Sequence, residues 1–114
     1  MTDCVFCRIA AKAIPASLVH EDELCVAFHD LNKQAPVHVL VAPKEHVVNL
    51  AEVAEEHGAL LAHLLLVARK VAEGEGVAGS GFRVVINSNA DAGQSVEHLH
   101  VHVLGGRAMG WPPG

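Results

Sequence analysis

Between residues 98 and 104 the sequence alternates histidine with aliphatic side chains, as His98-Leu-His100-Val-His102-Val-Leu104. Successive side chains of a β-strand point to opposite faces, so this period of two predicts a strand. Its three imidazoles then share one face, and the aliphatic residues between them pack behind the strand into a core. We predict a strand from Val96 to Leu104 that holds the imidazoles on a rigid element, as a preorganised site requires.

The rest of the chain predicts a small sheet with two helices. Apolar residues from about Ala51 to Glu73 recur at helical spacings, which indicates one long amphipathic helix. The segment Cys4 to Ala11 indicates a short helix that ends before Pro15. The strand-like runs are residues 17–20, 24–28, 37–42 and 82–86. Since their connections are short and the long helix is inserted once, we expect an α+β fold in which a five-stranded antiparallel sheet carries one long helix and a short N-terminal helix.

Length and charge narrow the class of protein. A chain of 114 residues fits a single domain, residues 1–114. A net charge of −5 with scattered Lys and Arg disfavours binding to a nucleic-acid backbone. No apolar run reaches the roughly 18 residues that cross a membrane, and the first residues lack a signal-peptide pattern, so we expect a cytoplasmic protein with no membrane partner.

The spacing of two cysteines indicates a metal-binding site. Cys4 and Cys7 form a Cys-x-x-Cys pair, which is half of a tetrahedral zinc site. A reduced thiol pair at the surface is the alternative. The three strand histidines cannot all bind one ion, because residues i and i+4 of a strand start about 13 Å apart. An odd number of cysteines without an export signal also argues against a disulfide framework.

The histidines suit phosphoryl chemistry. Neutral imidazole offers a nucleophilic nitrogen at neutral pH, and a second ring two residues away can deliver a proton. One nitrogen can attack phosphorus, after which water hydrolyses the phosphohistidine. Gly93-Gln94-Ser95 lies directly upstream, where its glycine, amide and hydroxyl favour phosphate binding. The plainer alternatives are a polar sheet face and an ordinary junction between loop and strand.

Residues 98–104 match every position of the signature His-φ-His-φ-His-φ-φ, where φ is apolar, and the sequence resembles the histidine triad family. The similarity covers nearly the whole chain and is strongest to the Hint branch, the purine nucleoside phosphoramidases. The chain departs from that branch at Gly110, where a histidine is common. The other matching segments are Phe28-His-Asp-Leu31, Gln34-Ala-Pro36, Pro43-Lys44 with His46, Gly93-Gln-Ser-Val96, Leu104-Gly-Gly-Arg107 and Trp111-Pro-Pro-Gly114.

The resemblance implies a role for individual residues. His100 is the nucleophile that becomes nucleotidylated, His102 and Ser95 lie near the leaving group, and His38 supports the triad. Asp30 accepts both ribose hydroxyls, a role that suits an acceptor-only carboxylate. The other residues implied for purine or phosphate binding are Phe6, Ile9, Phe28, His29, Leu31, Asn87 and Gln94. Without the resemblance, the apolar members of this set would be read as core residues and Asp30 as the start of a turn.

The resemblance also implies a structural zinc and a dimer. Cys4, Cys7, His46 and His98 would bind the zinc, which ties the N-terminal segment 1–16 to the catalytic strand and takes no part in catalysis. The long helix and the tail 105–114, with Trp111, would contact the second copy of a homodimer.

The expected function is therefore hydrolysis of purine nucleoside phosphoramidates, derivatives of AMP or GMP, to nucleoside monophosphate and amine through a nucleotidyl-histidine. Three alternatives stay open at this point: a dinucleoside polyphosphate hydrolase, a nucleotide-binding regulatory module without turnover, and a zinc-dependent hydrolase.

Overall fold

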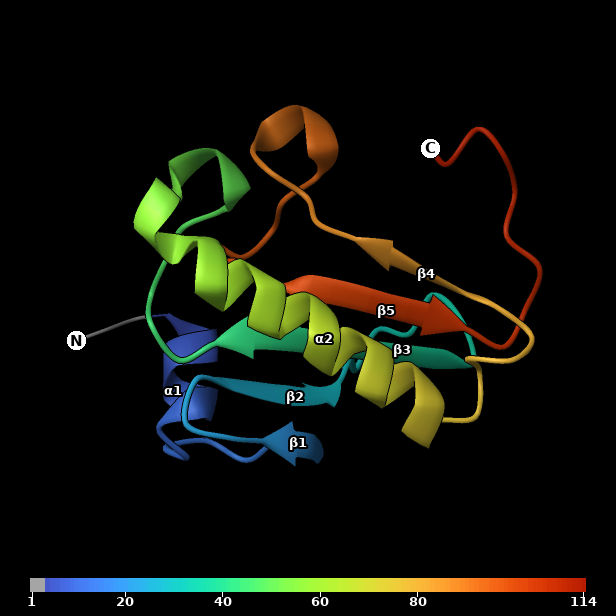
Figure 1. The fold of residues 1–114 in the computed structure, drawn as a ribbon, viewed down its shortest axis with the longest axis horizontal. Coiled ribbons are helices and arrows are strands. Elements are labelled where there is room, and N and C mark those ends of the chain that lie inside the picture. Colours follow the sequence, from blue (N-terminus) through green and yellow to red (C-terminus); the bar gives the residue numbers. More distant parts are fainter. Residues whose placement is uncertain (1–3) are drawn as a thin grey trace.

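One antiparallel sheet of five strands organises residues 4–114, the part of the chain that this computed structural model describes. The strands lie in the order β1-β2-β3-β5-β4, and every neighbouring pair is antiparallel (Figure 1). The predicted α+β class with its five-stranded sheet is confirmed. The strands are β1 (Leu18–Glu21), β2 (Cys25–His29), β3 (Val37–Pro43), β4 (Phe82–Val85) and β5 (Val101–Gly105).

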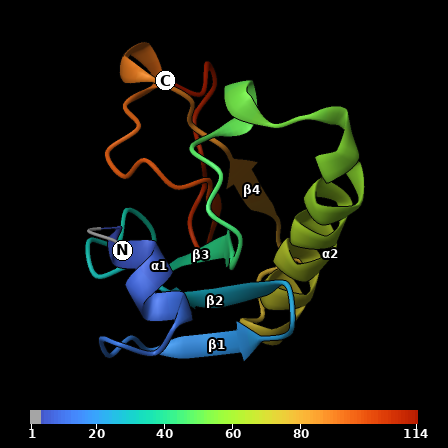
Figure 2. The ribbon, with the colours of Figure 1, turned by 90° about the vertical axis from the view of Figure 1, so that its left-hand side faces the viewer.

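The two helices cover opposite faces of the sheet. The short helix α1 (Val5–Ala10) lies on one side of β2 and β3, and the long helix α2 (Gly58–Gly74) lies on the other (Figure 2). Strand alternation therefore divides the buried side chains into two cores. The larger core joins α2 to Val39, Val41, Val101 and other sheet residues, whereas the smaller core consists of Phe6, Ile9, Val26, Phe28, Leu40 and Ala42.

A carboxylate closes the predicted hairpin between β1 and β2. Asp22 accepts the backbone N–H groups of Leu24 and Cys25 at 2.8 and 2.9 Å. It also accepts the Nε2–H groups of His20 and, from α2, His63 at 2.7 and 2.8 Å. Partial burial raises the pKa of Asp22, but these hydrogen bonds outweigh burial and hold the pKa well below its ordinary value. The turn is thus fixed to the long helix.

The long helix begins at Gly58, so the predicted start near Ala51 is wrong. Two 3-10 turns occupy the intervening stretch, Leu50–Glu52 and Glu55–His57. The Nδ1 atom of His57 accepts the backbone N–H of Ala54 at 3.0 Å, a local hydrogen bond that competes with helical ones. Within residues 4–114 no helix is both long enough and apolar enough to cross a membrane.

The last strand is also shorter than predicted, because β5 begins at Val101 and not at Val96. The chain bends before it, where the backbone N–H of Leu99 donates to Val47 O at 2.6 Å. His98 and His100 therefore precede the regular strand. The alternation of faces nevertheless persists, since Leu99, Val101 and Val103 are all buried in the larger core as predicted.

Candidate functional site

A cavity of about 290 Å³ opens on the α1 side of the sheet beside the histidines. Its walls are largely apolar with a few polar groups, which is typical of small-molecule sites. Val5, Pro15, Ala16 and Ser17 also line it, and the sequence did not single out these four. The cavity brings together most of the residues predicted to bind nucleotide: Phe6, Ile9, Phe28, His29, Asp30, Leu31, Ser95, His100 and His102.

The three triad rings form a row. The ring centroids of His100 and His102 are 4.9 Å apart, and the Phe6 ring meets both His98 and His100 at its edge. His100, in the middle, is 7% exposed. Its Nδ1–H donates to the carbonyl of His98 at 2.7 Å, so its Nε2 carries the lone pair. The central imidazole is therefore in the nucleophilic tautomer, with its ring against the cavity.

A second chain of hydrogen bonds sets the tautomers of His38 and His102. The backbone N–H of Gln34 donates to His38 Nδ1 at 3.0 Å, so the single proton of a neutral His38 lies on Nε2. That Nε2–H faces His102 Nδ1 at 2.9 Å. As His102 Nδ1 accepts this proton, its own proton lies on Nε2. The side-chain nitrogen Nδ2 of Asn87 lies 3.4 Å from that nitrogen and is itself a donor, so this N–H has no acceptor there and is available to a ligand.

Burial keeps both rings of this pair neutral. It lowers the pKa of His102 to about 4, with smaller contributions from the neighbouring His100 and His38. It also lowers the pKa of His38, against an opposing effect of Asp30. At neutral pH His102 thus presents a neutral N–H donor rather than a cation.

Asp30 connects this pair to the cavity. Its Oδ2 lies 3.3 Å from His38 Nε2, and its Oδ1 accepts the backbone N–H of Asn32 at 2.9 Å. Among the residues of 4–114 that line the cavity, it is the one carboxylate. The sequence predicted a ribose-binding residue here but not its contact with His38.

Two residues predicted to bind phosphate, Asn87 and Gln94, are not among those lining the cavity. The Gln94 amide holds the loop before β5: its Nε2 donates to Val48 O and Val96 O at 2.8 and 3.0 Å, and its Oε1 accepts the backbone N–H of Asn89. Asn49, which is fully buried, donates to the same Oε1 at 2.9 Å. The Gln94 side chain is therefore engaged in holding the loop that carries Ser95, a role that sequence patterns did not indicate.

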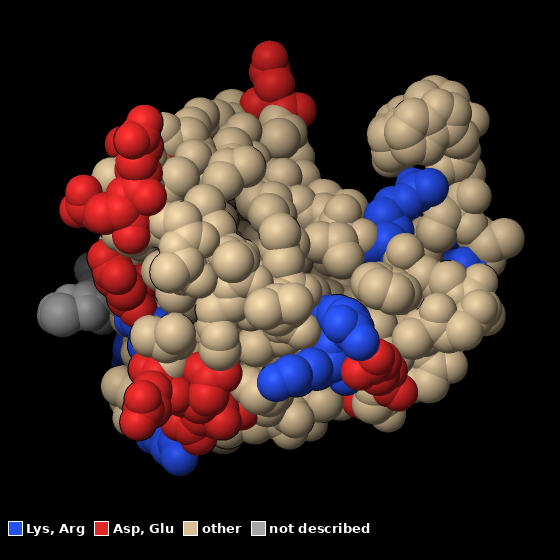
Figure 3. Space-filling view, viewed as in Figure 1, with Lys and Arg blue, Asp and Glu red and all other residues tan. Residues whose placement is uncertain are grey.

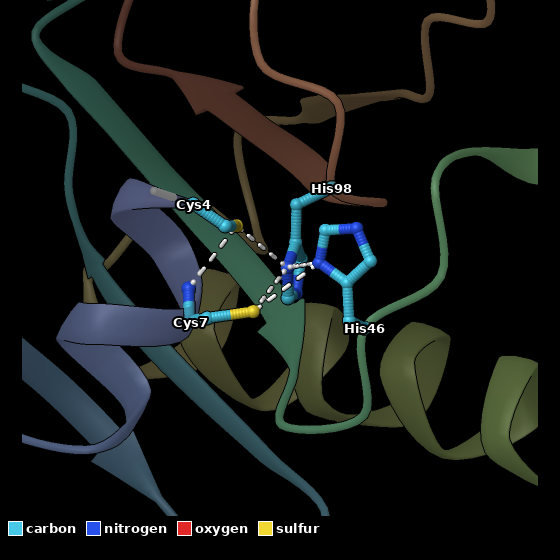
Figure 4. Close-up of side chains that lie close together, drawn as sticks. All are labelled: Cys4, Cys7, His46 and His98. Carbon is cyan, nitrogen blue, oxygen red and sulfur yellow. Dashed lines mark hydrogen bonds between the residues drawn. The ribbon is translucent and has the colours of Figure 1, made fainter. Parts of the chain in front are cut away.

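A separate cluster surrounds His98 and contains the four predicted metal ligands (Figure 4). Cys4 caps α1, Cys7 lies one turn further along it, His46 follows β3, and His98 precedes β5. The Nδ1 atoms of His46 and His98 are 3.1 Å apart. The distances from sulfur to these nitrogens are 3.2 to 3.4 Å.

This cluster has the chemistry of a tetrahedral metal site. His98 Nε2–H donates to Pro43 O at 2.8 Å, so its Nδ1 lone pair faces the other three ligand atoms. Zn–N and Zn–S bonds of about 2.1 and 2.3 Å in tetrahedral geometry imply ligand separations of roughly 3.3 to 3.8 Å. The four residues thus fit a zinc ion after small adjustments. Without a cation, burial and the neighbouring Cys4 raise the pKa of Cys7 to about 11.

Comparison with known proteins identifies the family. A family model described as the HIT domain matches residues 11–109. The chain belongs to the histidine triad family.

Other members of the family match this HIT protein over almost its whole length. It is 52% identical over 112 residues to an uncharacterized HIT-like protein of Synechococcus elongatus, across 98% of this chain and 97% of the relative. The crystal structure of a HIT family hydrolase from Legionella pneumophila superposes with a TM-score of 0.96 and 46% identity, covering 98% and 100% of the two chains. A histidine triad protein from Clostridium difficile gives a TM-score of 0.93 with 41% identity, covering 96% of each.

Proposed function

We propose that this HIT protein is a nucleotide hydrolase of the Hint type, which cleaves purine nucleoside phosphoramidates to nucleoside monophosphate and amine. One observation carries the proposal: His100 donates from Nδ1 and keeps the Nε2 lone pair, while its neighbour His102 keeps a proton on Nε2. A nucleophile and a hydrogen-bond donor thus lie side by side at the wall of the cavity. The hydrolase named among its structural relatives agrees with this chemistry.

The cavity walls fit a nucleoside monophosphate. Phe6 and Phe28, whose rings meet edge to face at 5.3 Å, offer an apolar slot for a purine. Asp30 offers acceptors for the two ribose hydroxyls. The phosphate would then lie between Ser95 and the triad rings. The Hint-type tail Trp111-Pro-Pro-Gly114 favours a phosphoramidate over a dinucleoside polyphosphate.

The reaction would proceed in two displacements. In the first, the Nε2 lone pair of His100 bonds to phosphorus, and the P–N bond breaks with its electron pair going to the leaving nitrogen. That nitrogen lies between His102 and Ser95 and takes up a proton from solvent. In the second, a water oxygen bonds to phosphorus and releases a proton to solvent, and the electron pair of the P–N(His100) bond returns to the imidazole, so that the proton taken up in the first step is given back. The His102 N–H and the Ser95 hydroxyl would stabilise the charge that develops.

Mass spectrometry of rapidly quenched enzyme tests the proposal. Adenosine 5′-phosphoramidate should leave an adenylyl adduct on the peptide that contains His100, and diadenosine tetraphosphate should be turned over more slowly. His100→Ala should lose turnover but keep AMP binding, which separates an enzyme from a binding module. A control variant, His57→Asn, changes a half-buried histidine that does not line the cavity. Equal turnover by wild type and His100→Ala would disprove the proposal.

We also propose that Cys4, Cys7, His46 and His98 hold a structural zinc ion. All four positions of a tetrahedral site are then protein ligands, so none is left for substrate. The ion would tie α1, which forms one wall of the cavity, to the strand that carries the nucleophile. Metal analysis of the purified protein, with thiol titration before and after chelation, tests this. Activity that survives chelation would also argue against a zinc-dependent hydrolase.

We further propose a homodimer. The edge strand β4 exposes Phe82 and Val84, and α2 exposes Leu65 and Leu66, so one face of the molecule carries unburied apolar side chains. Uncharged residues cover most of the middle of this face (Figure 3). A contiguous exposed apolar patch is a common mark of a protein–protein contact. Trp111, 83% exposed, would meet the same partner. Light scattering of wild type and Leu66→Glu, expected to be dimeric and monomeric respectively, tests this.

A further inference from the structure

We infer that the ribose hydroxyls of the nucleotide control how His102 is held, because Asp30 and His102 compete for the same proton of His38. The inference rests on the function proposed above and adds a link between the sugar and the reaction. It assigns Asp30 a positioning role, exerted through His38, beside its role in binding.

His38 has one proton and two acceptors for it. The backbone N–H of Gln34 occupies Nδ1, so the ring can donate only from Nε2. Nε2 lies 2.9 Å from His102 Nδ1 and 3.3 Å from Asp30 Oδ2. The ring is 3% exposed, which leaves its proton to these two partners. The proton is hydrogen-bonded to His102, and the Asp30 carboxylate at 3.3 Å attracts it as an ionic neighbour, which weakens the hydrogen bond to His102.

The two acceptors serve different parts of the substrate. Asp30 lines the cavity, its side chain is 22% exposed, and its Oδ1 is already bound to the backbone of Asn32. His102 lies in the row of triad rings beside the nucleophile. A ligand that occupies Asp30 therefore changes the acceptor balance at His38 without touching His102.

Ribose hydroxyls would shift the shared proton toward His102. An ionised carboxylate is the stronger acceptor, but its strength falls when two hydroxyl donors share its charge. The His38 Nε2–H then donates fully to His102 Nδ1, which fixes the tautomer with Nε2–H toward the phosphate. It also polarises that N–H, because a donor at one imidazole nitrogen strengthens donation from the other. A sugar without hydroxyls would leave Asp30 in competition.

Single-turnover rates at saturating substrate test the inference. In wild type, a 2′,3′-dideoxyadenosine phosphoramidate should react about tenfold more slowly than the ribose substrate, the size expected when one hydrogen bond in the transition state weakens. Asp30→Ala removes the competitor, so this variant should bind both substrates less tightly yet transform the dideoxy substrate faster than wild type does. Glu23→Ala, an exposed carboxylate on the β1–β2 turn, is the matched control and should behave as wild type.

Nitrogen chemical shifts give a readout that needs no turnover. In ¹⁵N-histidine-labelled protein, adenosine should move the signals of His38 Nε2 and His102 Nδ1 toward a stronger hydrogen bond, and 2′,3′-dideoxyadenosine should not. Equal saturating rates for both sugars in wild type, or no gain of the dideoxy rate in Asp30→Ala, would overturn the inference while the proposed function stands. Absence of turnover with the ribose substrate would instead refute the proposed function, and the shifts would still decide the coupling.

Discussion

The two ends of the histidine row differ in what lies between their nitrogens. At the His102 end a proton lies between the nitrogens of each ring contact: Gln34 N–H donates to His38 Nδ1, and His38 Nε2–H donates to His102 Nδ1 beside Asp30. Around His98 the Nε2–H is used by Pro43 O, and the Nδ1 atoms of His98 and His46 face each other at 3.1 Å beside two sulfur atoms. The three triad residues are all histidines on one face of the sheet. At the His102 end the ring nitrogens are satisfied by protons, whereas at the His98 end the facing lone pairs are suited to a cation.

The difference lies in the second nitrogen of each ring. A backbone N–H at His38 Nδ1 forces that ring to donate toward the triad, whereas a backbone carbonyl at His98 Nε2 forces its other nitrogen to present a lone pair. The same rule places the lone pair of His100 on Nε2. Backbone groups thus divide one row of imidazoles into an end suited to a metal, a middle ring with its lone pair on Nε2, and a donor.

The largest expected effect comes from replacing His100, the ring between the two ends of the row. His100→Ala should lower the rate of phosphoramidate hydrolysis by roughly 10³-fold or more, because the covalent step is lost. Steady-state kinetics measure it, and zinc content should not change. A rate within tenfold of wild type would mean that His100, between the two ends of the row, is not the nucleophile.

Breaking the metal-binding end should mainly cost stability. Cys7→Ser should lose bound zinc and lower the melting temperature by about 10 °C or more, since metal binding free energy contributes to folding. Elemental analysis and thermal unfolding at equal protein concentration measure this. Cys25→Ala, which removes a buried thiol elsewhere in the core, should keep its zinc. Equal zinc in Cys7→Ser would refute the assignment.

The donor end should respond to pH. His102 has a folded-state pKa of about 4 against an ordinary 6.5, so between these values the unfolded chain binds more protons. Stability should be fully present above pH 6.5 and fall by about 3 kcal/mol as the pH drops toward 4. Denaturant unfolding of wild type and His102→Asn at each pH isolates this contribution. A difference between the two that does not vary from pH 7 to pH 4 would contradict it.

The smallest effect concerns histidines outside the row. Asp22→Asn removes the carboxylate shared by His20 and His63, and should lower the free energy of unfolding by about 1 kcal/mol at pH 7 while turnover stays unchanged. Because the pKa of Asp22 is depressed, this stabilisation exists above the ordinary pKa of about 4 and is lost below it. The two proteins should therefore converge in acid. A changed turnover rate would mean that this carboxylate reaches the site.

Sequence patterns predicted the elements but not their ends. The period of two found the histidine strand, but β5 starts at Val101, because the hydrogen bonds of His98 to the end of β3 and of Leu99 to Val47 bend the chain. The apolar period found α2, but local hydrogen bonding at His57 delays its start to Gly58. Gln94 was chosen as a phosphate ligand from its place in the chain, whereas its amide is taken by Val48, Asn49, Asn89 and Val96.

The sequence by itself determined which residues could meet. Strand alternation puts the triad rings on one face, and the family motifs predicted a nucleophile, four metal ligands and most of the cavity residues. Only the tertiary structure decided where the protons lie, because a tautomer depends on the partner of each ring's second nitrogen. Those partners, His98 O, Pro43 O and Gln34 N–H, are backbone groups, which every residue carries and no sequence pattern can mark.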